Sequence, residues 1–219
     1  MGADIEDNSE KRPPPFIERI VEEFEELADT VRIISRISEM GEVARRYAVT
    51  NSFDSLLTML GVLMGSFISG LKEPSVIVNT VLGGAVAILI SGTMGTYLTE
   101  RAERASRIKE LEVAVLMDLD ETLVGKAESI SAVMVAAASG LAPFLVMMSL
   151  TVPFILSMNG MLSVMEAYVI SFIEVLTILF TLGVFLGSLS GENRLIYGAM
   201  LVGMGLLIVM VMLWLGISG

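Results

Sequence analysis

Five long apolar segments follow one another along the chain. They cover residues 47–71, 75–99, 130–160, 167–191 and 195–219. A helix needs about 20 apolar residues to cross the hydrocarbon core of a bilayer, and each segment is long enough. The runs are continuous rather than alternating, which excludes a membrane β-barrel. The pattern therefore predicts an all-α integral membrane protein with five transmembrane helices.

Polar sequence precedes and interrupts these segments. Residues 1–15 are acidic and Pro-rich, and we expect them to be disordered. Residues 16–46 carry apolar side chains at three- and four-residue spacing, which predicts an amphipathic helical region. Its apolar stripe would lie on the membrane surface or, as is more common, pack on the protein's own cytosolic face. The membrane domain then covers residues 47–219, with a charged, solvated helical connector at residues 100–129 between the second and third helices.

The basic residues indicate how the chain is oriented in the membrane. With five spans and a cytoplasmic N-terminus, every Lys and Arg except Lys72 falls in a cytoplasmic segment. The positive-inside rule therefore predicts a cytoplasmic N-terminus and an external C-terminus, and we expect a prokaryotic type of plasma membrane.

Composition excludes several classes of function. The chain has neither Cys nor His, so zinc fingers, disulfide frameworks, thiol catalysis and histidine proton relays are excluded. The HExxH motif of metalloproteases is also absent, and we do not expect an enzyme. A net charge of −11 argues against a nucleic-acid partner.

Two carboxylates interrupt the apolar segments. Asp54 lies in the first segment, and Glu174 lies in the fourth, while no Lys or Arg lies in any of the five. A carboxylate near the bilayer centre costs about 2.5–3.5 kcal/mol, so such residues usually face an ion pathway or a partner. Asp54 could instead cap a helix that starts at Ser55 near the membrane surface. Glu174 could also be tolerated in a water-filled pocket.

Carboxylates in the connector form a second group of candidates. Glu100, Glu103 and Glu110 fall near one face of a helix, where oxygen ligands would suit divalent cations. Arginines alternate with them, so a salt-bridged surface helix is the more common outcome of this pattern. Met94 is one of 16 methionines, whose thioethers could bind metals but are usually packing filler.

Glycines at four-residue spacing indicate close helix packing. Gly61 and Gly65 form a GxxxG pattern in the first segment, and Gly183 and Gly187 form another in the fourth. Such pairs let helix backbones approach closely, although glycine is common in membrane helices in any case.

Four stretches together resemble the vacuolar iron transporter family. FDSLLTMLGVLMG (residues 53–65) resembles the family's first membrane helix, which reads NDGLVTTLGLVAG. SGTMGTYLTERAERASRIKE (91–110) is similar to the end of its second helix, where a GEY-type turn leads into a charged helix. SGLAPFLVMMSL (139–150) resembles its third helix, and residues 179–205 resemble its fourth and fifth.

The resemblance implies a homodimer that moves Fe2+ or Mn2+ out of the cytosol, in exchange for protons, along a path between the subunits. It implies a pathway role for Asp54. Thr58, Met94 and Glu174 are further candidates for the ion pathway. The family's GEY glutamate corresponds to Thr96, and Glu100 lies one helical turn further on. We therefore expect metal ligands at Asp54, Thr96, Glu100, Glu103 and Glu110, and no permanently bound cofactor.

A second hypothesis belongs to another class of protein. The chain would be a membrane scaffold that kept the fold, lost transport and binds a partner through its acidic cytosolic helices. The missing GEY glutamate and the short connector favour this hypothesis, and the retained Asp54 disfavours it.

Overall fold

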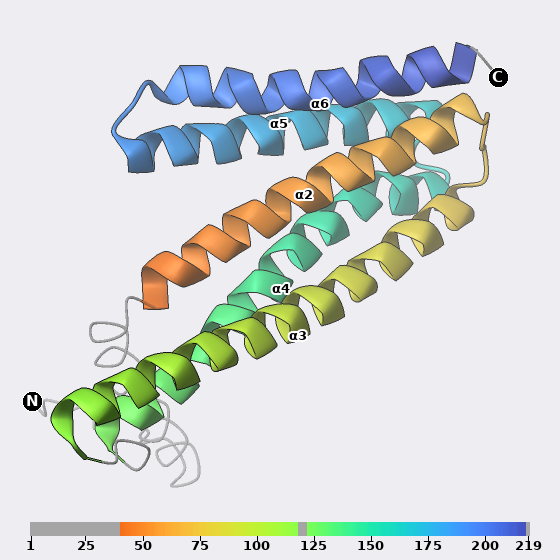
Figure 1. The fold of residues 1–219 in the computed structure, drawn as a ribbon. Coiled ribbons are helices and arrows are strands. Elements are labelled where there is room, and N and C mark those ends of the chain that lie inside the picture. Colours follow the sequence, from red (N-terminus) through yellow and green to blue (C-terminus); the bar gives the residue numbers. More distant parts are fainter. Residues whose placement is uncertain (1–39, 118–121, 218–219) are drawn as a thin grey trace, which may run out of the picture.

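The computed structural model describes residues 40–117 and 122–217, which form five α-helices and, within these ranges, no strand (Figure 1). The helices are α2 (Met40–Ile68), α3 (Pro74–Val115), α4 (Leu123–Met158), α5 (Val164–Ser190) and α6 (Arg194–Ile217). All five are long and apolar enough to cross a membrane, which confirms the predicted class of membrane protein and the number of spans. Residues 1–39, which hold the acidic start and most of the predicted amphipathic region, lie outside the described residues.

The helices run alternately in opposite directions and form three tiers. An α5–α6 hairpin lies on one side, α3 and α4 lie together on the other, and α2 lies between them (Figure 1). α3 packs closely on α4, and α2 also packs on α4, whereas α2 and α3 barely touch although they are consecutive. The sequence neighbours α2 and α3 are therefore held apart.

The core surrounds α2. Its apolar side chains meet those of the four other helices in one buried cluster, which includes Leu56, Leu60, Leu63, Ile77, Val81, Leu150, Phe154, Tyr168, Val175, Leu179 and Leu201. Tyr168 stacks edge-on against Phe154 with a ring-centroid distance of 5.2 Å, and its hydroxyl donates a hydrogen bond to the Leu71 carbonyl. This contact ties the start of α5 to the turn after α2.

Two helices extend beyond the predicted boundaries. The helix of the first apolar segment is already formed at Met40, the first described residue, which packs against Ala127 and Val135 of α4. α3 continues without a break through the predicted connector as far as Val115. Its 42 residues span about 63 Å, roughly twice the hydrocarbon thickness, so one end projects past the bilayer together with the start of α4.

The projecting part of α3 corrects the expectation of a fully solvated connector. Glu100, Arg104 and Ile108 are buried at four-residue spacing. That spacing places them on one face of the helix, toward α4. Helix–helix packing therefore continues outside the membrane, where Arg107 and Glu110 remain exposed.

The two glycine pairs have different surroundings. A Cβ on Gly183 would lie 2.5 Å from the Tyr197 carbonyl oxygen, and one on Gly187 would lie 2.7 Å from Cα of Arg194. This pair therefore allows α5 and α6 of the same chain to touch. A Cβ on Gly61, in contrast, would meet no atom of the described structure within 4 Å.

Candidate functional site: a polar groove between α2 and α3

Asp54 lies in α2, eight residues after Arg46, and is exposed on the surface of the single chain. A capping role at Ser55 is wrong, because the same helix already runs through the residues that precede Asp54. Its carboxylate makes no hydrogen bond or ion pair with the described residues. An unpaired carboxylate therefore lies within a helix that is long and apolar enough to span a membrane.

This carboxylate lines a groove of about 430 Å3 between α2 and α3. The lining residues are Tyr47, Asn51, Asp54, Ser55, Thr58, Ile88, Ser91, Gly92, Gly95, Thr96 and Thr99. The groove exists because α2 and α3 both pack on α4 rather than on each other. Gly92 and Gly95 also leave room there, because glycine has no side chain. Most of its polar groups are hydroxyls, which can accept from water or coordinate a cation.

A hydrogen-bond network joins three helices beside this groove. The Asn51 amide donates to Oγ of Ser139 at 2.6 Å, and the same Ser139 oxygen lies 2.6 Å from Oγ1 of Thr96. Ser139 is fully buried on α4, where its hydroxyl also reaches the Gly92 carbonyl at 3.2 Å. The network fixes the spacing of α2 and α3 on α4, and it holds Thr96 in place.

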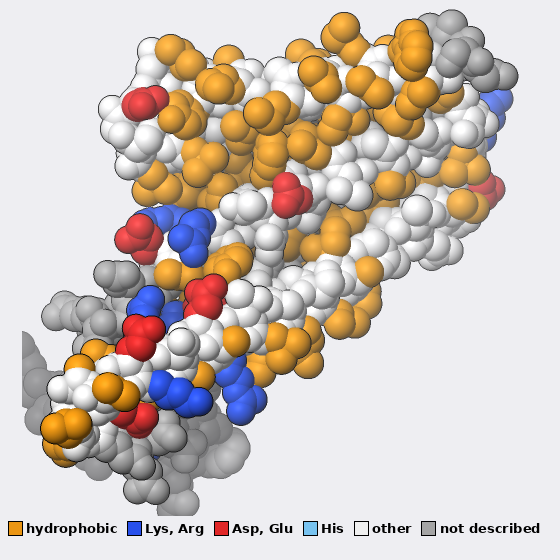
Figure 2. Space-filling view, in the orientation of Figure 1, with side chains coloured by type: hydrophobic (Ala, Val, Ile, Leu, Met, Phe, Trp, Pro, Cys, Tyr) orange, Lys and Arg blue, Asp and Glu red, His pale blue; other side chains and the backbone are white. Residues whose placement is uncertain are grey.

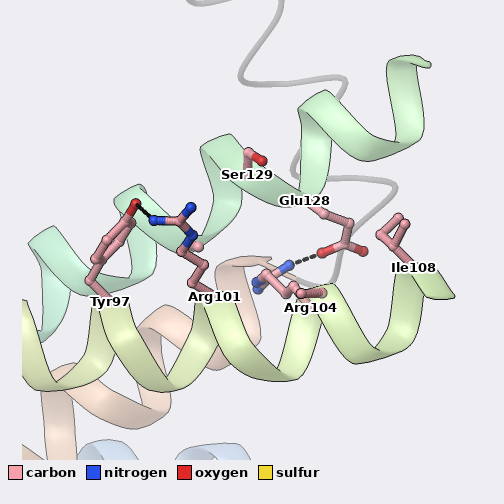
Figure 3. Close-up of a pocket in the computed structure, with 8 residues that line it drawn as sticks. Tyr97, Arg101, Arg104, Ile108, Glu128 and Ser129 are labelled. Atoms are coloured by element: carbon pink, nitrogen blue, oxygen red, sulfur yellow. Dashed lines mark hydrogen bonds and ion pairs between the residues drawn. The ribbon is translucent and has the colours of Figure 1, made fainter. Parts of the chain in front are cut away.

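A buried ionic cluster lies one helical turn beyond Thr96. Nη2 of Arg104 lies 3.0 Å from Oε2 of Glu100 on the same helix. Nη1 of Arg104 pairs with Glu128 of α4 (Figure 3). All three side chains are buried, with residue exposures of 3% for Glu100, 6% for Arg104 and 9% for Glu128. Glu100 is therefore engaged by a fixed cation, with which a metal ion would have to compete.

The structure brings some of the predicted ligands together and separates others. Asp54, Thr58 and Thr96 line the same groove. Glu103 and Glu110 are exposed on the projecting part of α3, and Met94 is 58% exposed. Glu174 is half-buried on α5, outside the groove lining. In the described part of the chain, no three Asp or Glu side chains gather as a metal-ligand cluster.

Sequence reasoning missed the roles of Asn51, Ser139 and Glu128. The four-residue spacing of Glu100 and Arg104 signals an ion pair on one helix. Nothing in the local sequence shows that Glu128, 24 positions after Arg104, completes the cluster. Ser139 likewise lies in an apolar segment with no polar pattern around it.

A second cavity lies on the other side of α3, next to the ionic cluster. It measures about 330 Å3 and is lined by Tyr97, Arg101, Arg104, Ala105, Ile108, Glu128, Ser129 and Ala132 (Figure 3). Arg101 lies 3.4 Å from the Tyr97 hydroxyl, to which its Nη1 donates. Because Tyr97 is separated from Gly95 by about 200° around the helix, this cavity and the groove do not share a face of α3.

Comparison with known proteins adds one relative. An uncharacterized protein of Methanocaldococcus jannaschii is 29% identical over 165 residues, which are 74% of this chain and 83% of that protein. No protein-family model matches the chain, and no solved structure matches it significantly.

Proposed function

We propose that this protein transports divalent transition-metal ions, Fe2+ or Mn2+, out of the cytosol in exchange for protons. The path would follow the groove between α2 and α3 at the interface of a homodimer. The observation that carries this proposal is the unpaired Asp54 carboxylate, which lies in an apolar stretch of α2 and lines a groove rich in hydroxyls. The sequence resemblance to the vacuolar iron transporters points to the same residue.

The energetics of Asp54 favour a cationic ligand. A charged carboxylate at mid-membrane is costly, and no base of the described residues offsets its charge. A divalent cation would offset it, and so would a proton, which makes the two ions competitors for one site. Oxygen ligands from Asp54, Thr58 and Thr96 suit Mn2+ and Fe2+.

A second copy would supply the ligands that one chain lacks. The groove holds Asp54 as its one acidic side chain, whereas metal sites in proteins usually combine several ligands. Gly61 follows Asp54 by about two turns and shares its face of α2, and it has free space beside it. Two α2 helices packed through this face would bring two Asp54 carboxylates toward one axis.

The proposed direction of transport rests on the distribution of bases. Of the nine bases in the described residues, seven lie on the starts of α2 and α4 and on the projecting end of α3, and Arg194 begins α6, while Lys72 lies in the turn at the opposite end of α2. The positive-inside rule places the first end in the cytosol of a plasma membrane of prokaryotic type. The exposed Glu103 and Glu110 would then attract cations at the cytosolic mouth.

Replacement of Asp54 by Asn tests the proposal. The variant keeps the size of the side chain but cannot balance a divalent charge or release a proton. In proteoliposomes with a proton gradient, we expect Fe2+ and Mn2+ flux to fall to the level of empty vesicles. Glu73→Gln, which removes a carboxylate from the exposed turn before α3, is the matched control and should transport normally. Undiminished flux through Asp54→Asn would refute the pathway.

The scaffold alternative is favoured by a specific observation. Glu100 is held by Arg104, and Thr96 is held by Ser139, which leaves Asp54 as the one free acidic group in the groove. A non-transporting protein would show no flux of either metal in the wild type. Its dimer content would also be the same for the wild type and for Asp54→Asn, with or without metal. Dimer content and flux together therefore separate the two hypotheses.

A further inference from the structure

α2 diverges from the α5–α6 hairpin toward the end where α2 begins (Figure 1). Near the other end the helices touch, because a Cβ on Gly216 of α6 would lie 2.5 Å from Cγ2 of Ile68. A Cβ on Gly65 would likewise lie 3.5 Å from the terminal methyl of Met212. The divergence leaves a wedge-shaped space between α2 and the hairpin, in the half of the membrane that contains the start of α2.

A cavity of about 540 Å3 occupies this wedge. Its lining residues are Glu42, Arg45, Arg46, Val49, Thr50 and Phe53 of α2, with Leu186, Leu189, Leu201 and Met204 of the hairpin. The charged residues lie at the start of the described part of α2, and the apolar residues come from later in α2 and from the hairpin. In Figure 2, acidic and basic side chains at the start of α2 stand beside the hydrophobic side chains of α5 and α6.

The rim of this cavity is positively charged. Arg45, Arg46 and Glu42 are the charged residues of the lining, which therefore carries a net charge of about +1. Within the described ranges neither arginine forms an ion pair, and Arg46 lies 5.6 Å from the ring centroid of Tyr47. Arginine binds phosphate with paired hydrogen bonds, so a rim with two arginines and one glutamate suits a phosphate group better than a cation.

We propose that this cavity binds one anionic phospholipid from the leaflet that surrounds the start of α2. The lipid phosphate contacts Arg45 and Arg46, and an acyl chain lies along Phe53, Leu186 and Met204. The volume is typical of a small-molecule site. The lining suits a phospholipid, because its charged residues can contact the headgroup and its apolar residues can contact an acyl chain. The excess of one positive charge selects an anionic headgroup over a zwitterionic one.

Native mass spectrometry of the full-length protein in mild detergent tests this site. The protein is incubated with equal amounts of phosphatidylglycerol and phosphatidylcholine of the same chain length. We expect one phosphatidylglycerol to be retained per chain in preference to phosphatidylcholine. Arg45→Gln with Arg46→Gln should weaken retention of phosphatidylglycerol by at least about tenfold, because charge-assisted hydrogen bonds to the phosphate are lost.

Two further variants separate the site from general attraction of lipid to bases. Arg101→Gln with Arg107→Gln removes the same charge from exposed positions on α3 and should retain the lipid like the wild type. Met204→Trp keeps both arginines but fills the cavity from a half-exposed position of α6, and it should also lose the lipid. Thermal unfolding confirms that each variant is folded.

Specific outcomes would overturn the proposal. Equal loss of lipid in the Arg101/Arg107 control would show unspecific electrostatic binding. Full competition by millimolar inorganic phosphate would show an anion site without a lipid. Absence of retained lipid in the wild type would show that another occupant, such as residues 16–39 of the chain, fills the wedge. None of these measurements depends on metal flux, so they leave the role of Asp54 as a separate question.

Discussion

The side-chain oxygens of Thr96 and Ser139 lie 2.6 Å apart, which joins a hydroxyl of α3 to a hydroxyl of α4 beside the α2/α3 groove. Ser139 also accepts a hydrogen bond from the Asn51 amide, so one buried hydroxyl connects the three helices that shape the candidate ion path. This arrangement makes Ser139 more important to the groove than its place in an apolar segment indicates.

Replacement of Ser139 by Ala should therefore destabilise the fold. We expect a loss of about 1–3 kcal/mol in the free energy of unfolding, because the Asn51 amide and the Thr96 hydroxyl lose a buried partner. Chemical denaturation in mild detergent measures the change. Ser149→Ala on the same helix is the control, because Ser149 donates to the Val146 carbonyl of its own helix. Equal effects of the two substitutions would contradict a special role for Ser139.

Disruption of the buried Glu100/Arg104/Glu128 cluster should lower the free energy of unfolding by more than the loss of Ser139 does. Arg104→Gln leaves Glu100 and Glu128 buried with no compensating charge, which should cost about 3–5 kcal/mol of unfolding free energy. Arg107→Gln changes an exposed base one turn away and should alter stability by no more than about 0.5 kcal/mol. The comparison uses the same denaturation measurement, and similar stabilities of the two variants would show that the cluster does not hold α3 on α4.

Close packing of α3 and α4 can be tested at Gly140. A Cβ at this position would lie 2.0 Å from Oγ1 of Thr93 and 2.7 Å from the backbone oxygen of Leu89, so Gly140→Ala must push the helices apart. We expect a loss of about 1–3 kcal/mol in stability. Gly203→Ala has open space around it and should be neutral or stabilising by up to about 1 kcal/mol, since Ala favours helix. A stable Gly140→Ala variant would mean that the crossing can relax.

The proposed dimer makes a different prediction at Gly61. Because space is free beside Gly61 in the single chain, Gly61→Leu should leave the unfolding transition nearly unchanged. If two α2 helices meet there, the substitution should weaken the dimer and reduce metal flux together. Light scattering in detergent gives the mass of the assembly, and flux is measured in proteoliposomes. A wild-type protein that is monomeric in mild detergent would count against the interfacial path.

The proposed orientation is tested with a reporter at the C-terminus. Five spans and the distribution of bases predict that a tag fused after Gly219 is external. Protease treatment or impermeant labelling of intact cells should therefore reach the tag, while a tag before residue 1 stays protected. A protected C-terminal tag would mean that the chain is inverted or that one helix does not span the membrane.

The sequence by itself determined the class of protein and the number of spans. Continuous apolar runs can satisfy their backbone hydrogen bonds in a membrane only as helices, so runs such as 75–99 and 167–191 needed no tertiary information. The sequence also identified Asp54 as unusual, because it is an acidic residue within an apolar segment. These properties depend on the chemistry of consecutive residues, which the sequence contains in full.

Tertiary structure decided which of these helices touch. α2 packs on α4 rather than on its neighbour α3, which opens the groove around Asp54, and α2 diverges from the α5–α6 hairpin, which leaves the wedge near Arg45. Packing of α3 on α4 buries Glu100 with Arg104 and Glu128, which removes Glu100 from the set of free ligands. Contacts between residues far apart in sequence depend on the shape of whole helix faces, and local periodicity leaves the pairing of those faces open.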